Sequence, residues 1–139
     1  MIKEMTTESE IRATFPVMKQ LRTHLSEDKY LEMVQRQREL HNYHVVAVIE
    51  DGQIQAVAGY RISECLSFGH FLYVDDLITD ERARSKNHGK ELMAWLVDEA
   101  KKHGCGQLHL DSGVQRHAAH RFYLRERMDI TCYHFALAW

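Results

Sequence analysis

The chain has 139 residues, a length that suits one domain with its own hydrophobic core. Hydrophobic residues make up 45% of it and the formal net charge is -2, so its composition is that of an ordinary globular protein and gives no sign of a nucleic-acid partner. No apolar run could span a membrane and the N-terminus lacks an apolar signal stretch, from which we expect a cytoplasmic protein without a membrane partner. The three cysteines are scattered and odd in number, which favours reduced thiols over a disulfide framework.

The N-terminal segment predicts a short strand followed by a helix. Ile2–Met5 can form the strand. Thr7 and Glu10 have the spacing of a capping box, in which each side chain caps a backbone N–H of the other residue at the start of a helix. Apolar residues then recur at helical spacing. Because proline is tolerated in the first turn of a helix but not in its interior, we expect a break near Phe15 and a main helix that starts around Pro16.

The next segment predicts a second helix and a β-hairpin. Ser26 is placed to cap a helix that runs to about Leu40. His44–Glu50 is rich in β-branched residues and predicts a strand, and Gln53–Ile62 alternates well enough to be the strand that returns. Between them, Asp51-Gly52 is a dipeptide that suits a type I′ turn.

The second half of the chain predicts strands separated by single helices. His70–Thr79 reads as a long strand, Gly89–His103 as a helix with one apolar face, and Gln107–Asp111 as a short strand. A short helix over Arg116–Arg125 and a closing strand over Ile130–Leu137 follow. A strand–helix–strand unit places its two strands parallel. The sequence therefore predicts an α/β fold with a mixed, mostly antiparallel sheet, a central parallel strand pair and helices on both faces.

The loop between the long strand and the next helix is basic. It contains Arg82, Arg84, Lys86 and Lys90. A helix N-terminus leaves backbone N–H groups unpaired, and these groups, together with the helix dipole, bind phosphate. Gly89 would let the backbone approach such a ligand closely. Neither a P-loop nor a dinucleotide-type glycine pattern is present, so the loop suits a diphosphate held in another way, although many loops of this kind are basic because they face water.

The run from Arg84 to Met93 resembles the acetyl-CoA-binding motif of the GNAT N-acetyltransferase superfamily, Gln/Arg-x-x-Gly-x-Gly/Ala. Arg84 matches its first position and Gly89 its last, while Asn87 stands where the family usually has glycine. Asparagine tolerates left-handed backbone angles better than most residues, so this departure is mild. The preceding Tyr73–Thr79 is similar to the strand that the family has before this loop.

A second stretch, Arg116–Tyr123, resembles the superfamily motif Asn-x-x-Ala-x-x-Phe-Tyr. Its last three defined positions are matched by Ala119, Phe122 and Tyr123, whereas Arg116 replaces the asparagine. The order of elements fits the family along nearly the whole chain. The resemblance therefore implies a single N-acetyltransferase domain over residues 1–139, with the acyl-CoA N-acyltransferase fold.

The resemblance implies an enzyme that moves an acetyl group from acetyl-CoA, its co-substrate, to a primary amine by direct attack in a ternary complex. Acetyl-CoA would lie between the strands His70–Thr79 and Gln107–Asp111, with a backbone N–H near Leu77 to stabilise the oxyanion. The residues implied to bind acetyl-CoA are Leu77, Ile78, Thr79, Arg84, Ser85, Lys86, Asn87, His88, Gly89, Lys90, Arg116, Ala119 and Tyr123.

Tyr123 occupies the superfamily's tyrosine position and is implied as the general acid, since a phenol can donate a proton at neutral pH. The alternative is a structural tyrosine whose ring packs in the core. Asp75 and Asp76 are candidates for the general base; as neighbours on a strand, they are expected to point to opposite faces, so that only one faces the substrate. Glu64 is a further candidate, and these acids could instead merely attract a cationic amine.

Other functions stay open from the sequence. One is a CoA-binding sensor or interaction module of the same fold without catalysis, which Asn87 and Arg116 in place of the usual residues keep open. Another is a metal-binding protein, because the chain has ten histidines; with neither HExxH nor CxxC present, we expect ordinary solvated histidines and no metal site. The acceptor could be a small-molecule or peptide amine, and the closing strand offers an apolar surface for a homodimer.

Overall fold

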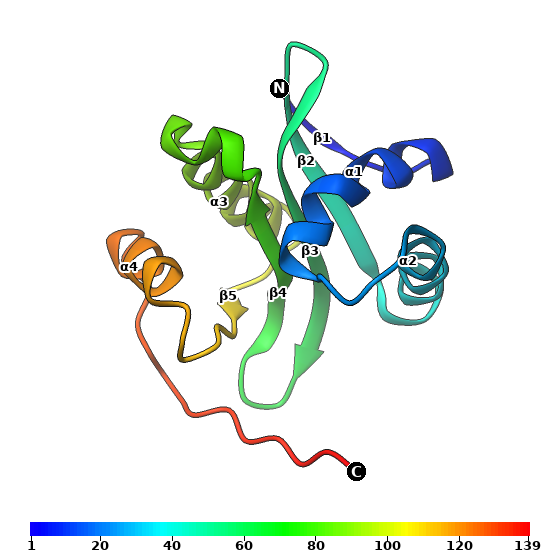
Figure 1. Cartoon of the computed structure of the whole chain (residues 1–139). Coiled ribbons are helices and arrows are strands. Elements are labelled where there is room, and N and C mark those ends of the chain that lie inside the picture. Colours follow the sequence, from blue (N-terminus) through cyan, green and yellow to red (C-terminus); the bar gives the residue numbers. More distant parts are fainter. The chain divides into compact units, whose positions relative to one another are not determined.

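The fold is described by a computed structural model of residues 1–139, which includes every side chain except that of Ser85. The chain divides into two units, Met1–His109 and Leu110–Trp139, and each unit is described by itself. Figure 1 shows the elements of both units coloured along the sequence. The expectation of one domain over all 139 residues stays a prediction.

The first unit is built on a mixed sheet with the strand order β1-β2-β3-β4-β5. Pairing is antiparallel from β1 to β4, and β4 and β5 form a parallel pair, which confirms the predicted α/β fold. Its elements in chain order are β1 (Ile2–Glu4), α1 (Glu8–Leu21), α2 (Glu27–His41), β2 (Tyr43–Glu50), β3 (Gln53–Cys65), β4 (Gly69–Thr79), η1 (Glu81–Lys86), α3 (His88–Lys102) and β5 (Gln107–Leu110), whose last residue belongs to the second unit.

Local signals in the sequence set the helix starts and the first hairpin. Thr7 and Glu10 form the predicted capping box, and Ser26 caps α2 as predicted. Asp51 and Gly52 both have positive φ, 52° and 73°, as the predicted type I′ turn requires.

The predicted break at Pro16 is wrong, because α1 continues through this residue. A proline inside a helix removes one backbone hydrogen bond and its ring crowds the carbonyl four residues earlier, at a cost of about 3 kcal/mol. Ile11, Val17 and Met18, on both sides of it, are buried against the sheet, and this burial outweighs the local penalty.

Helices cover both faces of the sheet in the first unit (Figure 1), as the sequence predicts. On one face, Tyr43, Val45 and Ala47 of β2 pack with residues of α1 and α2 in the main buried cluster. The next residues along the strands point the other way, and there Tyr60 of β3 meets Trp95 of α3 with ring centroids 6.0 Å apart.

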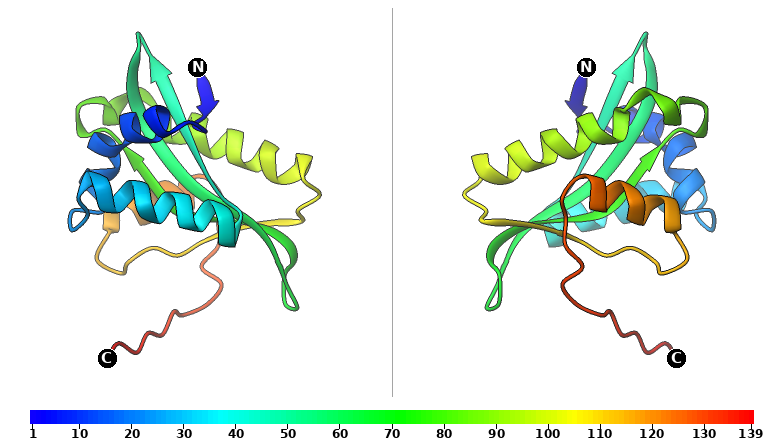
Figure 2. Two further views of the ribbon diagram at one scale, coloured as in Figure 1. Left: turned by 90° about the vertical axis from the view of Figure 1, so that its right-hand side faces the viewer. Right: turned by 90° about the vertical axis from the view of Figure 1, so that its left-hand side faces the viewer.

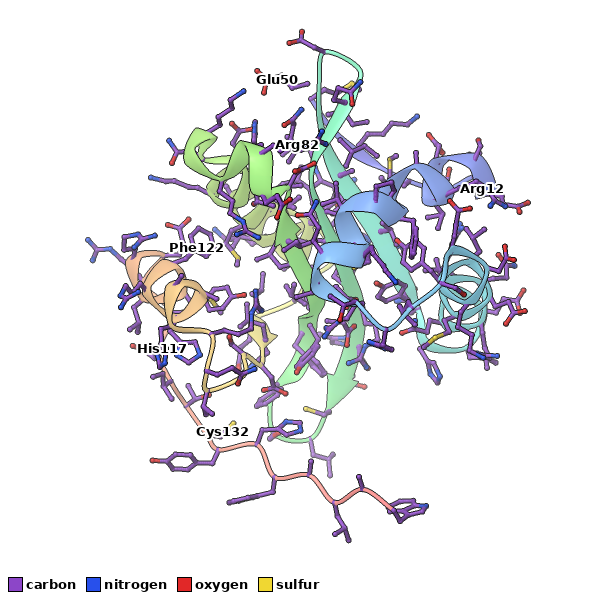
Figure 3. All side chains as sticks on the ribbon, in the orientation of Figure 1. Arg12, Glu50, Arg82, His117, Phe122 and Cys132 are labelled. Atoms are coloured by element: carbon purple, nitrogen blue, oxygen red, sulfur yellow. The ribbon has the colours of Figure 1, made fainter. Side chains whose placement is uncertain are left out.

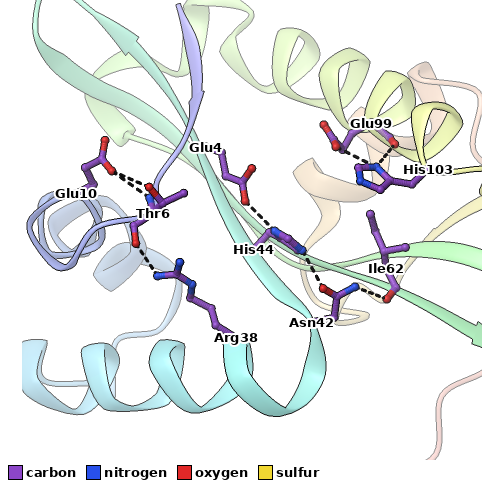
Figure 4. Close-up of polar contacts among 9 residues, drawn as sticks. All are labelled: Glu4, Thr6, Glu10, Arg38, Asn42, His44, Ile62, Glu99 and His103. Carbon is purple, nitrogen blue, oxygen red and sulfur yellow. Dashed lines mark hydrogen bonds and ion pairs between the residues drawn. The ribbon is translucent and has the colours of Figure 1, made fainter.

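Polar contacts fasten the edge of the sheet next to these helices (Figure 4). The His44 ring lies between Glu4 Oε1 on β1, at 2.7 Å, and Asn42 Oδ1, at 3.1 Å. Asn42 donates its side-chain N–H to the Ile62 carbonyl at 2.9 Å, and Arg38 of α2 donates to the Thr6 carbonyl at 2.8 Å. These bonds tie β1 and α2 to the central strands.

The hairpin of β3 and β4 is longer than predicted, because β3 continues to Cys65 instead of ending at Ile62. Figure 2 shows its far end extending beyond the helices of the first unit. Positive φ at Gly69, 69°, allows the tight return into β4. Phe68 beside this turn stacks on His109 of β5 with ring centroids 3.7 Å apart.

The second unit contains α4 (His117–Arg125), close to its predicted bounds. The predicted closing strand over Ile130–Leu137 is wrong, since residues 126–139 form no helix or strand. Alternating apolar residues favour a strand only where a neighbouring strand supplies hydrogen bonds, and the sequence cannot show whether one is present. The homodimer surface assigned to this strand stays a prediction. Along the described residues, no helix is both long and apolar enough to cross a membrane.

Candidate active site

The predicted diphosphate loop directly follows β4. The chain makes a 3-10 turn at η1, passes through Asn87 in the left-handed region with φ 63°, and enters α3 at His88. Asparagine is among the few residues other than glycine that accept this conformation. The substitution of Asn87 for the usual glycine thus preserves the turn that opens the helix.

The N-terminus of α3 has no side-chain cap. Thr7 and Ser26 accept backbone N–H bonds at the starts of α1 and α2, whereas Asn87 makes no such bond at the start of α3 among the described residues. The first N–H groups of a helix lack acceptors within it, which here include those of His88 and Gly89. Free amides at a helix start, together with the helix dipole, are able to bind an anion.

Three of the four loop cations add positive charge to this helix start. Arg84, Lys86 and Lys90 are exposed. Arg82, labelled in Figure 3, instead pairs with Asp80, with Arg82 Nη2 2.9 Å from Asp80 Oδ2. The side chain of Ser85, another predicted binding residue, lies outside the part that the structure describes.

Asp80 organises the entry to the loop, and local sequence reasoning missed it. The residue is 3% exposed, and its carboxylate accepts bonds from the backbone N–H and the guanidinium of Arg82. These bonds lower the pKa of Asp80 to about 2. An acidic residue just before a short helical turn is a cap signal that could have identified it.

Replacing Asp80 with alanine should lower the free energy of unfolding by about 1–2 kcal/mol at neutral pH, the usual cost of a lost cap. Its pKa lies below the ordinary value of 3.8, so the folded state gains stability above about pH 4 and loses that gain as pH falls to about 2. In urea unfolding, the difference in free energy of unfolding between wild type and D80A should become smaller as pH falls through this range. Asp98→Ala, at an exposed position on α3, is the control; a difference independent of pH would contradict the assignment.

His88 was predicted to bind acetyl-CoA, but its ring is buried away from solvent, at 5% exposure. Its Nε2 lies 3.3 Å from Glu50 Oε2. His88 lines a cavity of about 480 Å³ together with Met1, Val48, Glu50, Lys86 and Glu91. The part of this residue available to a ligand at the helix start is therefore its backbone N–H.

The strand before the loop carries a β-bulge at the predicted catalytic acids. Gly59 pairs with Asp76 and Tyr60 pairs with Val74, which leaves Asp75 as the extra residue on β4. A bulge interrupts the alternation of side chains and bends the strand. Beyond it, Leu77, Ile78 and Thr79 pair in regular register with β3 and lead into the loop.

The bulge places both acids on one face, so the expectation that they point to opposite faces is wrong. Tyr43 and Arg61 are cross-strand partners and therefore share a face. The Tyr43 hydroxyl donates to Asp76 Oδ2 at 2.7 Å, while Arg61 donates to both oxygens of Asp75 at 2.8 and 3.0 Å. Strict alternation predicts the wrong face because the sequence gives no signal for the extra residue.

A cavity of about 350 Å³ adjoins these acids, and we call it the Asp76 cavity. It is lined by Met18, Arg22, His24, Leu25, Tyr30, Met33, Val34, Gln37, Tyr43, Asp75 and Asp76. In it, Arg22 Nε donates to Asp76 Oδ1 at 2.8 Å, and Arg22 Nη2 donates to the Asp75 carbonyl at 2.8 Å. Burial, followed by the charge of Asp76, raises the pKa of Tyr43 well above its usual value, so this phenol stays a donor.

Gly59 makes the bond between Tyr43 and Asp76 possible. A Cβ at this position would overlap the Tyr43 hydroxyl and lie 2.7 Å from Asp76 Oδ2. Arg22 and Gly59 were not predicted as site residues, because they come from separate elements and no local pattern links them. Glu64, the other candidate base, lies 3.4 Å from His70 at the exposed hairpin and does not line the Asp76 cavity.

The second unit carries the remaining predicted residues. Arg116 is the N-cap residue of α4, and Ala119 and Tyr123 lie within this helix. Burial raises the pKa of the Tyr123 phenol above its usual value, and the Arg116 side chain acts in the opposite direction. The described residues contain no group of three or more His, Cys, Asp or Glu side chains arranged to hold a metal ion.

The chain shares its fold with a solved acetyltransferase. The aminoglycoside N-acetyltransferase AAC(6')-Iy, solved in complex with CoA, has a TM-score of 0.86 to this chain, covering 100% of it and 93% of that chain at 13% identity. The chain belongs to the Acetyltransferase (GNAT) family, which matches residues 7–128, and the predicted resemblance is thereby confirmed.

Two relatives in sequence are also named as N-acetyltransferases. The uncharacterized N-acetyltransferase YhdJ of Bacillus subtilis (strain 168) is 35% identical over 130 residues, which are 94% of this chain and 91% of that protein. The glucosamine 6-phosphate N-acetyltransferase of Arabidopsis thaliana is 33% identical over 95 residues, 60% of this chain and 62% of that protein.

Proposed function

We propose that this protein transfers the acetyl group of acetyl-CoA to a primary amine by direct attack in a ternary complex. One observation carries the proposal: a single strand, β4, connects two complementary sites. Asp75 and Asp76 at its bulge adjoin a cavity of small-molecule size, and Leu77–Thr79 lead from there into the uncapped, basic start of α3. An acceptor and a diphosphate-bearing donor bound at these places would have their reactive ends along the same strand, and proximity alone supplies much of the rate.

The start of α3 fits the diphosphate of the coenzyme. Backbone N–H groups of His88, Gly89 and Lys90 would bind its oxygens, with Arg84 and Lys86 supplying charge-assisted bonds. The backbone of Leu77–Thr79 would align the rest of the coenzyme. When bound, acetyl-CoA supplies the activated acyl group, and the chain's own residues orient it and handle the protons.

Three proton transfers accompany acylation of an ammonium substrate: the nitrogen loses one proton before attack and a second, to solvent, as the amide forms, and the departing thiolate gains one. An alkylammonium, with a pKa of roughly 10, must lose its proton before attack. Asp76 is the preferred base, directly or through water, because one of its oxygens is bound only by the neutral Tyr43 hydroxyl, whereas the Arg61 guanidinium binds both oxygens of Asp75. Tyr123, protonated at neutral pH, is assigned as the acid that protonates the thiolate leaving group.

The activity test is the release of CoA thiol from acetyl-CoA on addition of an amine. Amine-dependent release, with the acetylated amine identified by mass spectrometry, is the expected result. Binding of acetyl-CoA without transfer to any amine would instead favour the catalytically inactive CoA-binding module. No binding of CoA or acetyl-CoA at low salt would overturn the proposal as a whole.

Removing two loop cations with Arg84→Gln and Lys86→Gln should weaken CoA binding by about 10- to 100-fold at low salt, because each guanidinium or ammonium makes a charge-assisted bond to phosphate. The loss should shrink as salt screens the charges. Calorimetric titration with CoA measures both effects. The control is Lys101→Gln with Lys102→Gln, which removes the same charge from the other end of α3; equal affinity of the two double variants would contradict the assigned site.

A further inference from the structure

The charges around the Asp76 cavity balance one another. Arg22 pairs with Asp76, and Arg61, which is not a lining residue, pairs with Asp75. A ligand that brings one positive charge into this cavity would leave a positive charge without a partner, and a purely anionic ligand would leave a negative one. Half-buried charges without partners are costly, so the cavity favours a ligand that carries both signs.

Arg22 is placed to receive an anionic group. It is the C-cap residue of α1, and its guanidinium is held by Asp76 through Nε and by the Asp75 carbonyl through Nη2, both at 2.8 Å. Its third nitrogen, Nη1, makes no hydrogen bond to the residues that the structure describes. A guanidinium fixed in this way offers further N–H donors to a carboxylate or phosphate, and His24, on the following connection, lines the same cavity.

Asp76 is placed to receive the amine of the same ligand. Tyr43 and Arg22 each donate one bond, to different oxygens of this carboxylate. Each carboxylate oxygen can accept a second bond, so an ammonium can bind without displacing either residue. Because the pKa of Tyr43 is well above its usual value, its hydroxyl stays a donor to Asp76 and adds no negative charge.

We propose that the acceptor is a small dipolar amine, one that carries a carboxylate, phosphate or phosphonate together with its amino group. The anionic group binds Arg22, and the amino group binds Asp76, which lies on the strand that leads to the coenzyme loop. A volume of about 350 Å³ limits the acceptor to a small molecule. Polyamines are disfavoured, since every further ammonium group would approach Arg22. This substrate class rests on the proposed acetyl transfer to an amine.

Matched pairs of amines test the proposal. In each pair one member carries the anionic group and the other lacks it: glucosamine 6-phosphate with glucosamine, and 2-aminoethylphosphonate with ethylamine. Affinity is measured calorimetrically on protein saturated with CoA, where no transfer can occur, and initial rates are measured separately with acetyl-CoA. In at least one pair, the anionic member should bind wild type at least about 10-fold more tightly, as expected for a charge-assisted guanidinium contact.

Arg22→Gln should remove this preference. It should weaken binding of the anionic member of each pair about 10- to 100-fold, while the affinity for the other member changes little. The matched control is Arg12→Gln, since Arg12, labelled in Figure 3, is on the same helix and pairs with Glu27 outside the cavity. Circular dichroism establishes that both variants are folded. The comparison within wild type needs no variant and decides the proposal if R22Q fails to fold.

Binding affinity and initial rate test two different statements: the first tests the dipolar ligand, and the second tests the proposed acetyl transfer. Preference in binding without acetyl transfer supports the dipolar ligand and counts against the activity. Transfer to amines without any preference for the anionic members upholds the activity and overturns the dipolar ligand. The dipolar ligand is also overturned if R22Q weakens the binding of both members of a pair equally, or if neither pair binds to wild type.

Discussion

Replacing Gly59 with alanine should lower the free energy of unfolding by roughly 2–4 kcal/mol, because the added methyl group overpacks a filled site and breaks a buried bond to a carboxylate. The new Cβ would overlap the Tyr43 hydroxyl and lie 2.7 Å from Asp76 Oδ2. Tyr43 is buried, at 3% exposure, and its ring cannot move away without disturbing the core. Acceptor binding should fall with stability, since the displaced hydroxyl orients Asp76. Urea unfolding and calorimetric titration of acceptors measure the two losses.

Gly106→Ala is the matched control, because a Cβ at Gly106 has no atom within 4 Å and its φ is not in the left-handed region. The double variant Gly59→Ala with Tyr43→Phe removes the overlapping hydroxyl. Its free energy of unfolding should therefore exceed the value expected if the two single losses simply added. Additive losses, or a G59A protein as stable as G106A, would show that the hydroxyl does not determine the residue at position 59.

Features that depend only on residues close together in the sequence could be predicted from it. The capping box at Thr7 and the cap at Ser26 depend only on neighbouring residues, and so does the turn at Asp51-Gly52. The two elements that were predicted wrongly depend on distant ones. The helix through Pro16 is held by packing against the sheet, and the strand over Ile130–Leu137 required a partner strand that does not form.

In the candidate site, too, the part that is continuous in sequence could be predicted and the part assembled from distant residues could not. The loop from Arg84 to Lys90 is continuous in sequence, so its charge and its position at a helix start could be predicted. The Asp76 cavity is assembled from α1, α2, β2 and β4, and Arg22 lies 54 positions from the carboxylate that it binds. No periodicity in one segment can reveal such a partner. The bulge at Asp75 adds a second difficulty, because one extra residue reverses the expected direction of a neighbouring side chain.

These partners also change the chemistry assigned to the acids. Taken from the sequence, Asp75 and Asp76 are two equivalent carboxylates. In the structure both acids line the cavity, but the Arg61 guanidinium binds both oxygens of Asp75, while Asp76 accepts one bond from Arg22 and one from the neutral Tyr43 hydroxyl. Asp75 thus holds the bulge against Arg61, and Asp76 is the acid to which we assign the amine.

Replacing Tyr123 with phenylalanine should lower kcat by about 100- to 10,000-fold while leaving CoA affinity nearly unchanged, because the change removes a general acid and keeps the ring. A raised pKa keeps this phenol protonated through neutral pH, and its ability to donate is lost only as pH rises through that pKa. The basic limb of the wild-type rate profile should therefore lie above about pH 10, the ordinary value for tyrosine. Initial rates of thiol release, measured across pH, give both the loss of kcat and the position of the basic limb.

Tyr133→Phe provides the control, since Tyr133 is a second tyrosine of the same unit and is exposed. A structural tyrosine at position 123 would predict a different pattern, in which Y123F loses stability and CoA affinity together and the pH profile keeps its shape. Unchanged kcat in Y123F would exclude the phenol as the acid and leave protonation of the thiolate to solvent. A large loss of kcat with intact CoA affinity, absent in Y133F, together with loss of the basic limb of the pH profile, would support the hydroxyl as the acid and would separate an active transferase from a module that only binds the coenzyme.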